Sequence, residues 1–321
     1  MTTPANVVIV GGAGFIGRHV AARLAADGLS VRVFDQVRST PVPGVDAVVG
    51  DLGDAAALGA VLAPGAAVVH LAWTTIPATS NHDPSADLTE NVLASIRLFE
   101  ACTAARVGRV VYLSSGGTVY GNARRLPIRE EDPTEPLCAY GVSKLAVEKY
   151  LGLFQRLHGL EYVILRPGNA YGPGQDPNRG QSAVTVFAHR AARNEPITIW
   201  GDGSTTRDFL FVADLVDAIV RAVTYEPGAD GPRVFNVGTG RGTSLKDLLE
   251  VIGHVMGRAL EARYTPGRIA DVAANVLDSR RLREWMGWEP CVDLSEGVRR
   301  MLRAWGILEP HRTSLRGRPC A

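Results

Sequence analysis

The sequence predicts an α/β fold in which a doubly wound parallel sheet carries a smaller C-terminal lobe that binds substrate. Short runs that are apolar throughout alternate with helical stretches over residues 6–167, as expected of parallel strands that helices bury on both faces. The first run, NVVIV, passes directly into the glycine-rich turn GGAGFIG and a helical stretch. With 321 residues, the chain is long enough for one large domain or for a main domain with an appendage.

Six strands, separated by helices, are expected in this first part. The strands are predicted at residues 6–10, 31–35, 46–50, 66–73, 109–115 and 162–167. Helices are predicted at residues 15–28, from Asp54 onward, and near 87–105 and 137–157. Because parallel strands need a crossover connection, this order favours a doubly wound sheet.

The composition changes after Pro167. The next stretch, GNAYGPGQDPNRGQ, is rich in Gly, Pro and Asn, which indicates an ordered loop at a boundary. Short strands (PITIWGDG, RDFLFV and RVFNVG) then alternate with helices. The predicted main domain is 1–166, with parts of 207–252 returning to it. The predicted substrate lobe is 167–206 with 253–308, and 309–321 is predicted to be a mobile tail.

Charge and cysteine content narrow the class of protein. The 34 basic residues nearly balance 33 acidic ones, so we expect no nucleic-acid partner and no attraction to an anionic membrane. The four cysteines stand far apart, without a Cys-x-x-Cys pair or neighbouring histidines. This favours a reduced, cytoplasmic protein without a metal site. The N-terminal apolar run is too short for a secretory or membrane segment.

The glycine-rich turn after the first strand is typical of a dinucleotide site. Gly11 would allow the tight turn, Gly14 would bring a pyrophosphate close to the helix N-terminus, and Gly17 would let helix and strand pack closely. The second strand ends in Asp35, whose carboxylate can accept both ribose hydroxyls and would repel a 2′-phosphate. The turn therefore predicts a Rossmann domain that binds NAD. The alternative is a glycine-rich turn without function.

Other charged residues stand near this predicted site. Arg38 can pair with a 2′-phosphate, although an exposed loop arginine is more often solvated. Asp51 and Leu52 follow the third strand, where an adenine edge would pass. Asp51 can equally cap the helix that begins at Asp54.

Tyr140 and Lys144, in AYGVSK, stand four residues apart on one face of a predicted helix. An ammonium close to a phenol stabilises the phenolate, and an oxidised nicotinamide adds a second positive charge. Both effects lower the pKa of the tyrosine toward neutrality, where it is a general base. A surface pair that arises by chance is the alternative, and the preceding dinucleotide turn disfavours it.

At these motifs the chain resembles the extended short-chain dehydrogenase/reductases, specifically the NAD-dependent nucleotide-sugar epimerase and dehydratase branch. The resemblance covers almost the whole chain, through GGAGFIG, HLAW, ENVLAS, SSGGTVYG, YGVSK, RPGNAYGPG, WGDGSTTRDFLFV and RIADVAANVLD. It implies that Tyr140 is the base and that Lys144 binds the nicotinamide ribose and tunes the tyrosine. The predicted NAD-binding residues are Gly11, Gly14, Phe15, Ile16, Gly17, Asp35, Asp51, Leu52, Leu71, Ala72, Asn91, Ser114, Tyr140, Lys144 and Pro167.

The resemblance also implies that Asn169, Arg207 and Arg268 hold a nucleotide diphosphate. Charge favours this independently, since two loop arginines can clamp a pyrophosphate that the near-neutral protein as a whole would not attract. As the alternative, Arg207 can pair with Asp208 or Asp202 and fasten a hairpin.

Two further residues are implied to contact the nucleotide. Trp200 would lie against the pyrimidine, and Asp271 would reach a ribose. Trp200 can equally be a core residue. His70, His158 and His189 stand in strand or helix patterns without convergent partners, so we expect structural roles for them.

The loop LSSGGTVYG selects among the reactions of the branch. Members share a first step in which the tyrosine takes the proton of the sugar 4-hydroxyl while hydride leaves C4 for NAD. The dehydratases resemble one another in carrying acidic residues two and three places before the tyrosine of VYG, and the decarboxylases use a carboxylate in this loop. Counting back from Tyr120, those places are Thr118 and Gly117. The predicted activity is therefore C4 epimerisation of a UDP-hexose, an isomerase reaction of carbohydrate metabolism.

The same loop departs from the usual epimerase pattern. The hydroxyl residue expected four places before Tyr120 is Gly116 here, and the proton path to Tyr140 usually includes that side chain. Thr118 is predicted to replace it in catalysis and to contact the substrate. The alternatives are Ser115, also predicted to bind substrate, or Tyr140 acting alone.

The identity of the sugar stays open. Asn275, seven residues after Arg268, stands where the epimerase pattern gates the width of the pocket, and asparagine leaves room for an N-acetylated hexose. Arg179 can meet a C6 carboxylate, which would suit UDP-glucuronate, although a loop arginine beside Asp176 is more often solvated. UDP-glucose, UDP-N-acetylglucosamine and UDP-glucuronate are the candidates, and a dTDP-sugar is a further possibility.

Two other functions compete with epimerisation. A nucleotide 4-ketosugar reductase would consume NADH or NADPH, but Asp35 and the lack of an arginine pair for a phosphate disfavour it. An NAD-binding regulator without turnover usually loses the tyrosine or the lysine, and this chain keeps both Tyr140 and Lys144.

The resemblance further implies a homodimer. Its interface would be a four-helix bundle built from the helices near 87–105 and 137–157. Leu98, Cys102 and Leu151 are candidate contacts, and each can equally face the sheet.

Overall fold

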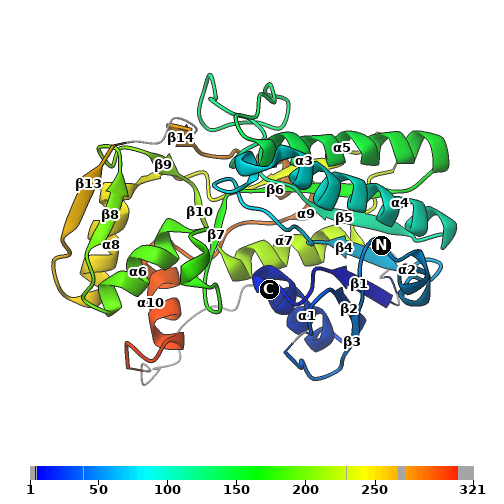
Figure 1. Ribbon diagram of the computed structural model, residues 1–321, viewed down its shortest axis with the longest axis horizontal. Helices are drawn as coiled ribbons and strands as arrows, with labels where there is room; N and C mark the ends of the chain where they lie inside the picture. The colour runs from blue at the N-terminus through cyan, green and yellow to red at the C-terminus, as the bar shows by residue number, and fades with distance from the viewer. Residues whose placement is uncertain (1–3, 5, 39, 229, 267–271, 310–321) are drawn as a thin grey trace.

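The centre of the molecule is a seven-stranded sheet with the order β11-β6-β5-β4-β1-β2-β3 (Figure 1). The structure is a computed structural model that describes residues 4, 6–38, 40–228, 230–266 and 272–309. All neighbouring strands of this sheet run parallel, and the chain order leads outward from β1 in both directions. The predicted doubly wound α/β fold is therefore confirmed. The strands are β1 (Asn6–Val10), β2 (Ser30–Asp35), β3 (Val45–Val49), β4 (Ala67–His70), β5 (Arg109–Leu113), β6 (Tyr162–Pro167) and β11 (Val234–Val237).

The central strands are apolar throughout because helices cover both of their faces. On β1, Val7 and Ile9 pack into one core, while Val8 and Val10 pack into the other, as the alternation of side chains along a strand requires. The run RVFNVG, predicted as a short strand after residue 167, forms β11 and extends the main sheet beside β6.

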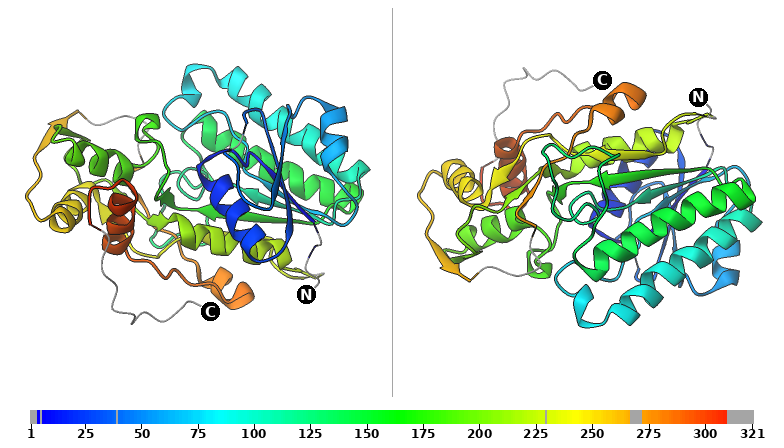
Figure 2. Two further views of the ribbon diagram at one scale, coloured as in Figure 1. Left: turned by 90° about the horizontal axis from the view of Figure 1, so that it is seen from below. Right: turned by 90° about the horizontal axis from the view of Figure 1, so that it is seen from above.

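Two groups of helices flank this sheet, as Figure 2 shows. On one face lie α1 (Phe15–Ala26) and α7 (Val212–Thr224). On the other lie α2 (Ala55–Val61), α4 (Ala94–Ala104) and α5 (Ala139–His158). The candidate dimer contacts Leu98, Cys102 and Leu151 are fully buried in this second core, so they face the sheet.

The chain from 84 to 104 is one continuous helical stretch of three parts, where a single helix is predicted. It consists of α3 (Pro84–Asp87), the π-helical segment η2 (Leu88–Leu93) and α4. The side chain of Asp83 accepts a hydrogen bond from Ala86 N and caps the start of this stretch. Short 3₁₀ turns, η1 (Ser80–His82) and η3 (Pro177–Arg179), lie before it and in the loop after Pro167.

A smaller group of elements lies beside the carboxyl ends of the central strands, on the left of Figure 1. Its core helices are α6 (Ala183–Ala192), α8 (Leu245–Met256) and α10 (Leu294–Ala304), and β8 (Ile197–Trp200) pairs with β13 (Ala262–Thr265). Ser244 and Asp247 form a capping box that begins α8.

Short strands and one further helix connect the two parts of the molecule. The pairs are β7 (Asn169–Tyr171) with β10 (Phe209–Phe211), and β9 (Thr206–Arg207) with both β12 (Thr243–Ser244) and β14 (Ala274–Asn275). The helix α9 (Arg280–Met286) packs beside β11. Within the described part of the chain, no helix is both long and apolar enough to cross a membrane.

Candidate active site

A single cavity of about 1500 Å³ lies at the carboxyl ends of the central strands, where ligands bind in doubly wound sheets. Its wall contains most of the residues predicted to bind cofactor and substrate. These are Gly11, Gly14, Phe15, Ile16, Gly17, Asp35, Asp51, Leu52, Leu71, Ala72, Asn91, Ser114, Ser115, Thr118, Tyr140, Lys144, Pro167, Asn169 and Arg207.

The glycine-rich turn has the geometry that its sequence predicts. Gly11 has a φ of +84°, and a Cβ there would collide with the backbone of Leu71 and Ala72. A Cβ at Gly17 would lie 2.6 Å from the carbonyl oxygen of Gly11, so the close approach of α1 requires glycine. At Gly14, the N-cap of α1, a Cβ would meet only that same oxygen, at 3.4 Å. The helix N-terminus is therefore open to a pyrophosphate, and the residues present fit a dinucleotide.

The carboxylate of Asp35 lies beside this turn at the end of β2. Its Oδ2 accepts a hydrogen bond from Ala13 N at 2.9 Å, which holds the acid against the turn. Asp51 accepts from Gly53 N and from the Gln36 amide, both at 2.6 Å. The cap of α2 is Asp54, so the alternative capping role of Asp51 is wrong.

Tyr140 and Lys144 project from the first turns of α5 into the cavity. The backbone N–H of Tyr140 donates to the Ser80 hydroxyl at 3.0 Å, which fixes the start of the helix. Lys144 Nζ donates to the carbonyl oxygen of Leu113 at 2.9 Å and lies 5.6 Å from the centre of the Tyr140 ring. The predicted pairing on one helix face is therefore present.

The pKa of Tyr140 is shifted in the opposite direction to the predicted one. Burial raises the pKa of Tyr140, and Cys138 and Asp87 raise it further. Burial lowers the pKa of Lys144 to about 7, against the opposing effects of Glu148 and Asp87. The protein groups therefore do not produce the predicted lowering of the tyrosine pKa, because burial dominates.

The loop after β5 carries Gly116, Gly117 and Thr118, which the sequence predicts to distinguish epimerases from dehydratases. A Cβ at Gly116 would lie 2.6 Å from Leu277 Cδ1 and 2.8 Å from the carbonyl oxygen of Arg166, so this position has no room for a hydroxyl residue. A Cβ at Gly117 would have only ordinary contacts, the nearest at 3.7 Å. Thr118 Oγ1 is buried and has no hydrogen-bond partner among the described residues.

A buried ion pair lies directly behind this loop. Arg166 Nη2 and Nε donate to the Glu148 carboxylate at 2.5 and 2.9 Å. The Ser114 hydroxyl donates to the same carboxylate at 2.5 Å, and Arg166 Nη1 donates to the Tyr120 hydroxyl at 2.8 Å. Glu148 stands one turn after Lys144, so this network ties the loop to the face of α5 that bears Lys144.

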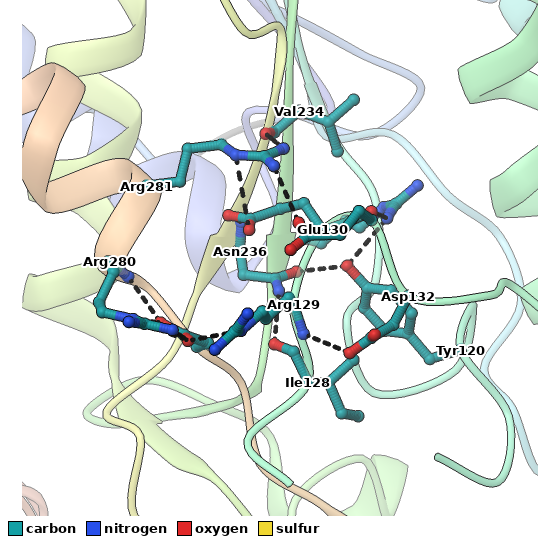
Figure 3. Close-up of polar contacts among 12 residues, drawn as sticks. Tyr120, Ile128, Arg129, Glu130, Asp132, Val234, Asn236, Arg280 and Arg281 are labelled. Carbon is teal, nitrogen blue, oxygen red and sulfur yellow. Dashed lines mark hydrogen bonds and ion pairs between the residues drawn. The ribbon is translucent and has the colours of Figure 1, made fainter. Parts of the chain in front are cut away.

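A second polar network fixes the far end of the loop to β11 and α9, as Figure 3 shows. The Tyr120 hydroxyl donates to Asn236 Oδ1 at 2.7 Å, and Asn236 Nδ2 donates to the Ile128 carbonyl at 3.0 Å. Asn236 N donates to Glu130, which also lies 3.6 Å from Arg281 Nε. The segment that bears Ser115 and Thr118 is therefore anchored at both ends.

The π-helical segment η2 supports the opposite wall of the cavity. Asn91 Oδ1 accepts from Thr74 N at 2.9 Å, and Asn91 Nδ2 donates to the Asp87 carbonyl at 3.0 Å. The fully buried carboxylate of Asp87 accepts from Ser143 at 2.5 Å and from Thr75. These bonds hold the loop after β4 against α5, and π-helical turns are frequent at functional sites.

The predicted sugar and nucleotide residues are only partly brought together. Trp200 is 42% exposed, and neither it nor Asn275 is among the described residues that line the cavity. Asn275 is buried instead, with Nδ2 donating to the Gly116 carbonyl at 2.8 Å. Arg268 and Asp271 lie outside the described residues. The core alternative for Trp200 is wrong, because the side chain is exposed.

Arg207 and Arg179, for which the sequence leaves alternative roles, also line the cavity. Arg207 faces it from β9, next to Asp208, whose buried carboxylate accepts from Thr239 N, Gly240 N and Leu277 N. Arg179 lines it from the loop after β7 and is exposed. Among the residues that the structure describes, no group of three or more His, Cys, Asp or Glu side chains is arranged to hold a metal ion.

Comparison with known proteins agrees with this geometry. A family model described as the NAD dependent epimerase/dehydratase family matches residues 7–238. The chain belongs to this family. Membership confirms the predicted resemblance, the predicted class of enzyme and NAD as its cofactor.

Relatives within the family match nearly the whole chain. A UDP-glucose 4-epimerase of Mycolicibacterium smegmatis is 38% identical over 303 residues, 91% of this chain and 96% of the relative. The structure of the Thermotoga maritima UDP-glucose 4-epimerase with UDP-glucose has a TM-score of 0.88 and 34% identity, covering 94% of this chain and 98% of that one. The Thermus thermophilus UDP-glucose 4-epimerase, in complex with NAD, has a TM-score of 0.86 and 33% identity, with coverage of 94% and 99%.

Sequence reasoning missed one aromatic residue in the site of this family member. Trp73 follows β4, lines the cavity and contacts both Lys144 and Tyr140. Its signal is visible in the motif HLAW, where a large aromatic residue follows the carboxyl end of a buried parallel strand, the edge at which such sheets bind ligands.

Proposed function

We propose that the protein is an NAD-dependent 4-epimerase of UDP-hexoses. One observation carries the proposal: a single cavity runs from the dinucleotide turn at Gly11 past Tyr140 to Asn169 and Arg207. Such a cavity can hold a cofactor and a nucleotide sugar side by side. The names of its relatives support UDP-glucose as one member of the substrate class.

In this proposal, Tyr140 takes the proton of the sugar 4-hydroxyl and later returns it. When bound, NAD supplies a reversible hydride acceptor for C4 of the sugar. The 4-keto sugar then turns in the cavity and is reduced on its other face, so the reaction has no net redox change. The positive charge of the oxidised cofactor, together with the ammonium of Lys144, offsets the effect of burial on the phenol.

Thr118 is the proposed relay between the sugar and Tyr140. Its buried hydroxyl lacks a partner among the described residues, so it is available for a substrate hydroxyl. The segments that bear Thr118 and Tyr140 are in contact. A Cβ added at Gly141, the residue after Tyr140, would lie only 2.9 Å from the Thr118 carbonyl oxygen. The Ser115 hydroxyl, also on the cavity wall, is the alternative relay.

The loop favours epimerisation over elimination. Dehydratases of the family carry carboxylates where this chain has Gly117 and Thr118, and elimination of water needs such an acid and base. At Gly117 the chain carries no side chain, so no carboxylate stands there to act on the sugar.

A UDP-glucuronate 4-epimerase is the second candidate, favoured by Arg179 on the cavity wall. Its guanidinium can pair with a C6 carboxylate that glucose and N-acetylglucosamine lack. The role of Asn275 in setting the width of the sugar pocket stays a prediction, as do the roles of Trp200, Arg268 and Asp271.

The assembly we propose is a homodimer through α4, α5 and η2. Exposed apolar side chains follow one face of α5, at Val142, Tyr150, Leu153 and Leu157, and the last of these is 64% exposed. Leu88 and Leu93 of η2 are also exposed. Burying such a stripe against its copy would remove apolar surface from water. Light scattering of the protein as it leaves a size-exclusion column measures the mass of the assembly, and we expect twice the mass of one chain.

The cytoplasmic location and the domain boundaries stay predictions.

The test of the proposed function is a side-by-side assay. UDP-glucose, UDP-N-acetylglucosamine and UDP-glucuronate are each incubated with the protein and NAD, and the products are separated by chromatography. We expect conversion of at least one sugar to its C4 epimer, without accumulation of NADH. If all three are inert, the proposal is wrong. Stoichiometric consumption of NADH or NADPH with a 4-keto sugar would identify a reductase instead.

A further inference from the structure

Trp73 contacts both members of the catalytic pair. Lys144 Nζ lies 3.7 Å from the centre of a Trp73 ring, compared with 5.1 Å for Tyr112 and 5.6 Å for Tyr140. An ammonium within about 6 Å of a ring centre is in cation–π range, and tryptophan is the strongest partner. The Trp73 and Tyr140 rings meet edge to face at 5.7 Å.

The carboxylates near Lys144 are committed to other groups. Glu148 is bound by Arg166 and Ser114, and Asp87 accepts from Ser143, Thr75 and Asn91. Among the described residues no carboxylate lies within ion-pair distance of Lys144. The ammonium therefore rests on the Leu113 carbonyl and on aromatic rings.

The remaining titratable groups around Lys144 do not supply a negative charge near neutral pH. His70, on β4, has its pKa lowered to about 3 by burial and by Lys144, so it is neutral. Burial raises the pKa of Tyr112, on β5, and the pKa of the Cys138 thiol at the start of α5, so both stay protonated. Besides the more distant charges of Glu148 and Asp87, the aromatic contact is therefore a favourable interaction for the charged lysine.

The orientation of the Trp73 ring is not set by a hydrogen bond of its indole. Its Nε1 is buried and has no hydrogen-bond partner among the described residues. The ring is held by its contacts with Lys144, Tyr140 and Tyr112. These contacts place a face of the Trp73 ring against the Lys144 ammonium.

We propose that Trp73 is a positioning residue of the active site, which holds the Lys144 ammonium between the Leu113 carbonyl and the Tyr140 ring. This inference deepens the proposed function and rests on it for its consequence in turnover. Trp73 acts through Lys144, by favouring the charged amine at a position where burial favours the neutral one.

The test measures the protonation of Lys144 directly. The chain has only three lysines, Lys144, Lys149 and Lys246, so a protein with carbon-13-labelled lysine gives few side-chain NMR signals. In the wild-type protein, the ε-CH₂ protons of Lys144 are expected upfield of those of the other two lysines, because the adjacent Nζ lies over the Trp73 ring. Signals of all three lysines at one common position would overturn the proposal without any variant.

Two variants and a control then isolate Trp73. Trp73→Leu removes the ring, and we expect the pKa of Lys144 to fall by about 0.5 to 1.5 pH units. Trp73→Phe keeps an aromatic ring with a weaker cation–π interaction, so Lys144 should retain most of its wild-type pKa. Trp285→Leu, at an exposed tryptophan of α9, should leave Lys144 unchanged. An identical Lys144 pKa in the wild type and Trp73→Leu would overturn the proposal.

The titration is done on the full chain, both with saturating NAD and without it. Because it needs no turnover, it can fail independently of the sugar assay. If the protein epimerises a UDP-sugar, the alkaline limb of the kcat profile should move to lower pH in Trp73→Leu by the shift that NMR measures. In Trp73→Phe, the alkaline limb should lie close to its wild-type position. A pH profile that does not move while the Lys144 pKa falls would contradict the positioning role.

Discussion

Lys144 and Arg166 are two buried cations whose surroundings differ. They are 3% and 4% exposed and flank the same loop. For Arg166, burial alone would lower the pKa, but the hydrogen bonds and charge of Glu148 outweigh it and raise the pKa. For Lys144, burial dominates and lowers the pKa to about 7. One cation is paired to a carboxylate through two hydrogen bonds, and the other rests on a carbonyl and aromatic rings.

The difference is the one expected between a charge that holds the structure together and the functional charge that we propose for Lys144. A paired guanidinium keeps its charge at every accessible pH, so Arg166 and Glu148 can hold the loop in one position. An ammonium whose pKa lies near neutrality responds to any nearby charge, which is what a residue that tunes a catalytic tyrosine requires. Substitution of the two cations should therefore change stability in opposite directions.

Arg166→Met removes the buried ion pair with Glu148. The Glu148 carboxylate is left buried without its cation, so we expect the free energy of unfolding to fall by about 3 to 5 kcal/mol. Urea denaturation followed by circular dichroism measures the loss. The control is Arg193→Met, which removes a solvent-exposed ion pair with Glu195 and should change the free energy of unfolding little. A loss for Arg166→Met as small as that of the control would show that Glu148 does not depend on its partner.

Lys144→Met removes the cation that has no carboxylate partner and should stabilise the fold. Near pH 6 the wild-type protein buries a charged amine, and removing it should raise the free energy of unfolding by about 2 to 4 kcal/mol, less the lost hydrogen bond to Leu113. The unfolded lysine keeps its proton up to its ordinary pKa of 10.5, whereas the folded one loses it near 7. Between these values the unfolded state binds more protons, so wild-type stability rises with pH and the advantage of the variant shrinks.

The measurement for this prediction is urea unfolding of wild type and Lys144→Met at pH 6, 8 and 9.5. The gap in unfolding free energy should narrow steadily across the series. A variant less stable than wild type at pH 6 would contradict the account of Lys144 as a destabilising buried cation.

The sequence predicts the cofactor half of the site far better than the sugar half. Gly11, Gly17 and Asp35 are found on the cavity wall because glycine spacing and strand order alone determine the carboxyl edge of a parallel sheet. Asn275 is found buried beside Gly116, since its position depends on the pairing of β14 with β9, across many residues of chain. Periodicity carries no information about such a distant pairing.

The electrostatics of the site could not be predicted from spacing. The separation of Tyr140 and Lys144 gives their common helix face, but not the direction in which the tyrosine pKa moves. That direction depends on burial and on the charges of Cys138 and Asp87, which only the folded chain brings close to the phenol. Trp73 was missed for a related reason, since a tryptophan after a buried strand is also typical of a core.

The most direct test of the proposed function is turnover by Tyr140→Phe. The assay uses the UDP-sugar that the wild type converts fastest, and NAD is released by denaturation and quantified in both proteins. The account predicts that kcat falls by about 100-fold to 10,000-fold, while the bound NAD is unchanged, because only the proton transfer is lost. Turnover by Tyr140→Phe within about tenfold of the wild type, at equal NAD content, would contradict the role of Tyr140 as the base.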